Sequence, residues 1–297
     1  MRFMMLVKAA KDFEAGAWPD EKLLSEMAKW TEELVKAGAR LESGRLQPSS
    51  KGVRVRYANE KFMVTDGPFA ESKELIAGFC LIQVKSRDEA VEWAKRVPFQ
   101  EGEIELRPLY ELFDFPVDPA EKPDGWREKE EQYRAAPPAR KPGTIRYMGL
   151  VKADKDTEAG VLPDEKGLAT MGAFLEEGLK AGVFLSGEGL QPSSKGARVR
   201  FAGNKRTVTD GPFAETKELV AGYAILQFAS KAEAIEWTKR FVQVDAPLRL
   251  GGESECELRP FFEFEEFGAS EAVERFRQMG VGTSYRHDGE DPPHAGA

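Results

Sequence analysis

Apolar and polar positions along the first hundred residues alternate in patterns that predict short strands and amphipathic helices. The apolar run at residues 3–7 is typical of a strand buried on both faces. Apolar positions then recur every three or four residues over 24–35, which predicts an amphipathic helix that begins after Asp20 and ends before Gly38. Strict alternation at 53–57 predicts a strand with one apolar face.

The remaining elements of this half of the chain follow from turn and capping residues. A two-residue turn joins 53–57 to 62–65, which predicts a hairpin. Residues 77–84 read as a buried strand, a capping box at Ser86 starts a second helix, and a closing strand is expected at 104–109. The order strand, helix, strand, hairpin, strand, helix, strand predicts an α+β, ferredoxin-like fold with an added hairpin.

The same order returns in the second half of the chain. Residues 64–78 recur as 208–222 with only two differences in fifteen positions, whereas the helix-like segments upstream have drifted freely. The chain is therefore a tandem duplication. The near-identity indicates a constraint on this stretch, and that constraint can be backbone geometry or chemistry.

The duplication divides the chain into four parts. Two ferredoxin-like repeats are expected at 1–113 and 144–264, a linker rich in proline and charge at 114–143, and a tail with a short helix followed by a disordered end at 265–297. A ferredoxin-like sheet carries helices on one face only, so the other face needs a partner. We predict that the repeats pair within the chain, sheet against sheet, as a pseudo-dimeric α/β barrel.

Composition and charge argue against several classes of partner and cofactor. The net charge is −8 and no basic cluster is present, so direct nucleic-acid binding is not expected. No apolar run approaches the ~18 residues of a membrane span, so the chain is read as cytoplasmic. Cys80 and Cys256 do not occupy matching repeat positions, which argues against a disulfide framework or a zinc site. We therefore expect neither metal nor cofactor.

Three groups of polar residues are candidates for a site. Asp66 and Asp210 stand in Thr-Asp-Gly-Pro, where each either caps its own turn, with the glycine supplying an unusual φ, or faces a ligand as a base or acceptor. A charged group recurs beside each aspartate, as a cleft lining or as a salt-bridge lattice between repeats. Its members are Glu71, Lys73, Glu74, Glu215, Lys217 and Glu218.

Arginines form the third group. They project from the polar face of the alternating strand in each repeat, and they are Arg54, Arg56, Arg198 and Arg200. If that face lines the barrel, four guanidinium groups make an interior suited to a carboxylate or phosphate ligand. If the face points outward, they are an ordinary polar edge.

The motif Asp-Gly-Pro-Phe-Ala-Glu-x-Lys-Glu, present at 66–74 and 210–218, resembles the DGPF branch of the YCII-related family. The resemblance covers residues 1–110 and 145–261 and implies a dimeric α/β barrel. It also implies an association with sigma-factor transcription systems. The enzyme-like branch is thought to use a histidine on the first helix, but the first helix of each repeat here has none, so a histidine mechanism is not expected.

Three function hypotheses remain open from the sequence. The leading one is a binding or regulatory module for a small metabolite, an anionic one if the arginines line the cleft. The second is a carboxylate-based lyase, isomerase or hydrolase in which Asp66 or Asp210 and the neighbouring glutamates transfer protons. The third is an adaptor for a transcription regulator.

Overall fold

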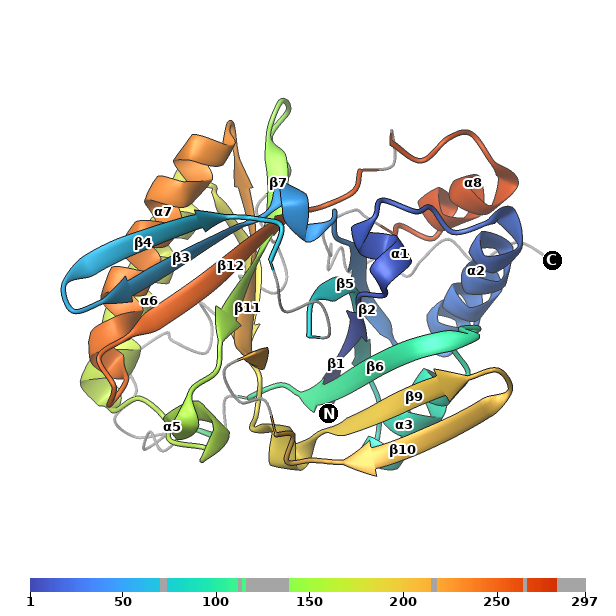
Figure 1. The fold of residues 1–297 in the computed structure, drawn as a ribbon, viewed down its shortest axis with the longest axis horizontal. Helices are drawn as coiled ribbons and strands as arrows, with labels where there is room; N and C mark the ends of the chain where they lie inside the picture. Colours follow the sequence, from blue (N-terminus) through green and yellow to red (C-terminus); the bar gives the residue numbers. More distant parts are fainter. Residues whose placement is uncertain (70–73, 112–113, 116–138, 215–217, 264–265, 282–297) are drawn as a thin grey trace.

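The computed structural model describes residues 1–69, 74–111, 114–115, 139–214, 218–263 and 266–281. These residues form a mixed α+β structure with two six-stranded antiparallel sheets (Figure 1). Most of the expected linker and the end of the tail lie outside them. Among the described residues, no helix is long and apolar enough to cross a membrane.

Each repeat contributes the same succession of elements. The first supplies β1 (Arg2–Lys8), α1 (Lys11–Glu14), α2 (Glu21–Lys36), β2 (Arg40–Arg45), η1 (Ser49–Lys51), β3 (Val53–Ala58), β4 (Lys61–Asp66), β5 (Ile76–Gln83), α3 (Arg87–Lys95) and β6 (Glu101–Pro108). The second supplies β7 (Ile145–Lys152), α5 (Lys155–Glu158), α6 (Glu165–Ala181), β8 (Phe184–Gly189), η3 (Ser193–Lys195), β9 (Ala197–Ala202), β10 (Lys205–Asp210), β11 (Val220–Phe228), α7 (Lys231–Asp245), η5 (Ala246–Leu248) and β12 (Ser254–Pro260). A last helix, α8 (Glu271–Gln278), follows.

The predicted helix boundaries are confirmed, because the capping residues act as expected. The Asp20 side chain accepts a hydrogen bond from the backbone N–H of Leu23 at the start of α2. Ser86 caps α3 in the same way. Gly182 ends α6 in the left-handed conformation, with φ of 63°, which glycine adopts without steric cost.

The hairpins are exchanged between the repeats. The strand orders are β10-β9-β6-β1-β5-β2 in one sheet and β4-β3-β12-β7-β11-β8 in the other (Figure 1). The hairpin β3–β4 of the first repeat therefore extends the sheet of the second, with β3 paired to β12. The hairpin β9–β10 extends the sheet of the first repeat through β6. The order of elements is as predicted, but each hairpin leaves its own repeat.

Apolar side chains fill three layers between the elements. Helices α2 and α3 cover one sheet and α6 and α7 cover the other, as Figure 1 shows. A shared cluster, which includes Met4 and Leu6 from β1 and Met148 and Leu150 from β7, lies between the two sheets. Single bridges, Leu46 to Phe261 and Leu109 to Leu190, join the sheets at two corners. Both sheets stay open at their edges, so the expected barrel is not closed.

The last described residues pack against the first repeat. Helix α8, capped by Ser270, packs on α2, and Arg275 pairs with Glu32 at 2.6 Å. The guanidinium group of Arg40 donates to the carbonyl oxygens of Met279 and Gly280 just beyond α8. The short tail helix is thus confirmed, and it is held on the helix face of the first repeat.

Candidate functional site

Two buried ion networks lie where an exchanged hairpin meets the closing strand of the other repeat. The first network consists of Lys8, Glu74, Glu105, Arg107 and Arg198. The second consists of the repeat counterparts Lys152, Glu218, Glu257, Arg259 and Arg54. In each network one arginine comes from the other repeat, so neither network exists within one repeat alone.

Glu105 is the centre of the first network. Its carboxylate is fully buried and lies 3.0 Å from Lys8 Nζ, 3.1 Å from Arg107 Nη1 and 2.8 Å from Arg198 Nη2. Burial by itself raises the pKa of this carboxyl, but the three cations outweigh it and lower the pKa to about 2. Glu257 has a pKa of about 2 for the same reasons, so both central carboxylates are ionised at neutral pH.

Glu74 and Glu218, the last residues of the repeated motif, are held differently in the two networks. Arg198 donates to both oxygens of Glu74, at 3.2 and 2.9 Å, and Lys8 Nζ lies 2.7 Å away. Glu218 lies 3.6 Å from Arg54 and 3.9 Å from Lys152. Its side chain is 23% exposed against 10% for Glu74. The lysine and arginine therefore lie closer to the motif carboxylate in the first network than in the second.

The motif loop is anchored beside each network. The ring of Phe69 lies under the guanidinium group of Arg54 at 4.2 Å, and Phe213 lies under Arg198 at the same distance. The backbone N–H of Phe69 donates to the hydroxyl of Ser49, which in turn donates to Glu14. These contacts explain why the Gln-Pro-Ser-Ser and Asp-Gly-Pro-Phe segments changed so little between repeats.

Gly67 is required by packing rather than by its φ angle. Neither Gly67 nor Gly211 has a positive φ, which corrects the expectation of an unusual backbone conformation. A Cβ atom at Gly67 would lie 1.9 Å from the carbonyl oxygen of Ser49, and one at Gly211 would lie 1.9 Å from that of Ser193. The backbones of the two loops approach too closely for any side chain.

The variant Gly67→Ala is therefore expected to lose about 1–3 kcal/mol of unfolding free energy, as overpacked sites do. Urea unfolding measures this loss. Gly251→Ala is the control, because a Cβ atom there meets nothing within 4 Å. Equal stability of the two variants would contradict the close approach.

The aspartates of the motif lie outside the networks. Both are exposed: Asp66 accepts from Lys231 Nζ at 2.7 Å, and Asp210 accepts from Arg87. Each of these ion pairs joins one repeat to a helix of the other. The two carboxylates thus tie the exchanged hairpins to α7 and α3 and do not converge with Glu105 or Glu257.

The predicted charged residues separate into three groups. Arg54, Arg198, Glu74 and Glu218 meet in the networks. Arg56 and Arg200 are exposed further along the same strands, and Arg56 pairs with Glu253 at 2.6 Å. Glu71, Lys73, Glu215 and Lys217 lie outside the described residues. The four arginines therefore do not line one common interior.

Sequence reasoning missed the most buried members of the networks. These are Lys8, Glu105 and Arg107 with their counterparts Lys152, Glu257 and Arg259. The signal was present, because the pattern Glu-Leu-Arg-Pro occurs in the closing strand of both repeats. Charged residues that alternate with leucine in a strand predict one polar face. Their recurrence in both repeats indicated that these residues are candidates for a site.

A separate buried carboxyl links the two sheets. Glu42 on β2 accepts a hydrogen bond from Ser186 on β8 at 3.4 Å. Burial raises its pKa to about 7, although Arg146 and Arg40 oppose the shift. Ser186 is the repeat counterpart of Glu42, so this feature exists once in the chain. It is a carboxyl group that titrates near neutral pH.

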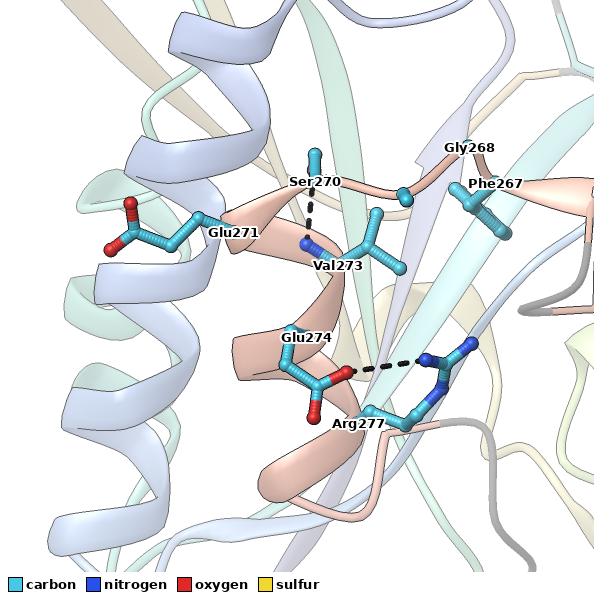
Figure 2. A pocket seen from close by; sticks show the side chains of 8 residues that line it. Phe267, Gly268, Ser270, Glu271, Val273, Glu274 and Arg277 are labelled. Atoms are coloured by element: carbon cyan, nitrogen blue, oxygen red, sulfur yellow. Dashed lines mark hydrogen bonds and ion pairs between the residues drawn. The ribbon is translucent and has the colours of Figure 1, made fainter.

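Two surface hollows among the described residues stand out, and neither is lined by the network residues. One, of about 550 Å³, is lined by residues of a single segment from Phe267 to Arg277 (Figure 2). In Figure 2 its polar groups pair with each other, Ser270 with the N–H of Val273 and Glu274 with Arg277. The other, of about 340 Å³, lies beside Gln47, Tyr147 and Phe261. The second draws on η1, β7 and the end of β12, but it contains no residue of the two networks.

Comparisons with known proteins agree with the duplicated architecture. The family model of the YCII-related domain matches the chain twice, at residues 1–113 and 145–259. An uncharacterised protein of Rhizobium meliloti (strain 1021) is 34% identical over 100 residues, which is 32% of this chain and 81% of that protein.

A solved structure described as a novel heme-binding protein from Thermus thermophilus covers 94% of each chain, with a TM-score of 0.38 and 14% identity. The assignment rests on the family match, which spans most of the chain. The chain belongs to the YCII-related family and carries its domain twice.

Proposed function

We propose that this protein is a pseudo-dimeric, barrel-like binding module for a small anionic metabolite, with a regulatory role in the cytoplasm. The observation that carries the proposal is the Lys–Arg pair that grips the motif glutamate in each network. In the first network Arg198 contacts both oxygens of Glu74 and Lys8 lies beside it, an arrangement that proteins use to bind a ligand carboxylate or phosphate. Glu74 and Glu218 occupy the place of such an anion.

The longer distances around Glu218 favour the second network as the ligand site. A ligand must displace the motif glutamate from its cations, and this displacement costs less where the contacts are 3.6 and 3.9 Å than where they are 2.7 and 2.9 Å. The motif carboxylate then acts as an internal competitor. Release of the motif glutamate from its cations is the step that couples ligand binding to the motif loop.

Duplication has a clear role in this proposal. Arg54 of the first repeat reaches Glu257 of the second at 2.9 Å, and Arg198 reaches Glu105 at 2.8 Å. A site built in this way needs two copies of the domain. The tandem chain supplies the second copy covalently and lets the two sites diverge, as the glutamate distances already do.

Calorimetric titration with acetate, succinate and inorganic phosphate at low ionic strength tests the proposal. We expect at least one of these anions to bind, Arg54→Met to weaken it at least tenfold, and Glu218→Gln to strengthen it. Arg56→Met is the matched control, because this arginine lies two residues away on the same strand but points to solvent. Absence of binding to both the wild type and Glu218→Gln, or equal effects of the two arginine variants, would contradict the proposal.

An acid/base enzyme is the second candidate, and Glu42 is the observation that favours it. A carboxyl group with a pKa of about 7 is suited to proton transfer at neutral pH, unlike Glu105 and Glu257. Loss of any detected turnover in Glu42→Gln, with retained turnover in Arg54→Met, would favour this candidate.

A further inference from the structure

Strand β4 is an open, apolar sheet edge. It is the last strand of its sheet, and all six of its residues are exposed. Three consecutive apolar side chains stand on it: Phe62 is 42% exposed, Met63 60% and Val64 41%. Edge strands present unpaired backbone N–H and C=O groups, and natural proteins usually protect them with charge or a covering segment. In β4, apolar side chains stand in the middle of the edge, where a charged residue or a covering segment is expected.

The equivalent edge of the other sheet carries different residues, which makes the comparison informative. Strand β10 has Arg206 and Thr207 where β4 has Phe62 and Met63. The guanidinium group of Arg206 lies over the ring of Phe201 at 4.6 Å and donates to the carbonyl oxygens of Lys95, Phe99 and Gly203. One edge therefore carries a hydrogen-bonded arginine and a threonine, and the other carries Phe62 and Met63 at the same positions.

We infer that β4 is a homodimerisation edge, at which the β4 strands of two copies of this chain pair antiparallel. An exposed strand edge accepts another extended strand, because only that shape satisfies a row of backbone groups. A two-fold axis normal to the sheet relates the two strands. Residues that lie opposite each other then have their side chains on the same face of the sheet, so their numbers are both odd or both even. The register centred on Met63 meets this requirement and places Phe62 opposite Val64 of the second copy and Met63 opposite itself.

This register is self-complementary in apolar groups. It opposes Lys61 to Thr65 and buries the apolar residues of both strands. It also brings Glu60 near Asp66 of the second copy. The negative charge of Asp66 is already compensated by Lys231, which lies 2.7 Å from it. A six-residue edge buries much less than the ~1,600 Å² of a standard interface, so the dimer is expected to be weak and concentration-dependent.

Sedimentation equilibrium over a concentration series tests this inference with a matched variant. Phe62→Arg combined with Met63→Thr gives β4 the residues that stand at these positions of β10, which already folds as an edge strand in this chain. We expect the wild type to approach twice its monomer mass of 33.1 kDa as concentration rises, and the double variant to stay monomeric. Thr207→Lys on the other edge is the control and should dimerise normally.

Three results would overturn the inference: a wild type that stays monomeric throughout, a double variant that dimerises normally, or masses beyond the dimer, which indicate pairing between unlike edges. The register has its own test. Met63→Cys should form an intermolecular disulfide under a mild oxidant, because this position faces itself across the axis. Val64→Cys should cross-link much less, and both native cysteines are buried. Equal cross-linking would reject the register centred on Met63.

Discussion

Replacement of Glu105 by glutamine is expected to lower the unfolding free energy by about 3–5 kcal/mol, the largest loss we expect from any single substitution in this chain. The substitution leaves Lys8, Arg107 and Arg198 around a neutral side chain in a buried site. Removing one partner of a buried ion network is costly because the remaining charges stay desolvated and lose their compensation. Urea unfolding at neutral pH measures the loss.

Acid should reproduce this effect in the wild type. The pKa of Glu105 is about 2 in the folded protein, below its ordinary value of 4.5, so the folded state favours the ionised form. This contribution is complete above about pH 4.5 and is lost as the pH falls towards about 2. Glu257 adds a second contribution of the same sign over the same range.

Glu253→Gln is the control for both experiments. Glu253 pairs with Arg56 at 2.6 Å, but both side chains are exposed. Exposed ion pairs contribute little, so this variant should stay within about 1 kcal/mol of the wild type. A loss of less than about 1 kcal/mol in Glu105→Gln would show that water or backbone movement solvates the remaining cations, and would reject the buried network as a source of stability.

The second large effect is expected between about pH 4.5 and pH 7. Glu42 has a pKa of about 7 in the folded protein, raised by burial from 4.5. The folded state therefore favours the protonated form, and this contribution is complete below about pH 4.5 and is lost as the pH rises through about 7. A shift of this size corresponds to at most about 3 kcal/mol.

The groups that face Glu42 decide how much of this effect remains. Arg40 and Arg146 favour the ionised form, Glu188 disfavours it, and Ser186 donates the 3.4 Å hydrogen bond. Burial outweighs the two arginines, and Arg146 is already engaged elsewhere, because its guanidinium group pairs with Glu263 at 2.9 Å.

Glu42→Gln provides the test, because glutamine keeps the shape and cannot ionise. The difference in unfolding free energy between the variant and the wild type should grow in favour of the variant from about pH 4.5 to about pH 7 and change little above that. The difference between the two proteins cancels the titration of His287 and His294, which both retain. Parallel pH profiles would reject the raised pKa.

The local elements were predictable because their causes are local. Asp20 and Ser86 cap the helices they precede, and the alternation at 53–57 gives β3 a buried and a polar face. A salt-bridge lattice between repeats was one alternative for Glu74, but its partner Arg198 was not predicted. The roles of Asp66 and Asp210 were not predictable, since their partners Lys231 and Arg87 are far away in sequence.

The sequence by itself determined the duplication, the order of strands and helices, and the family, because all three follow from residue patterns within each repeat. Only the tertiary structure decided which sheet receives each hairpin. The closing strands β6 and β12 share the pattern Glu-Leu-Arg-Pro, and backbone hydrogen bonds do not distinguish one edge from another. The alternating pattern of β3 fits either edge equally well. The networks depend on that choice, because Arg54 and Arg198 reach their glutamates only across the exchange.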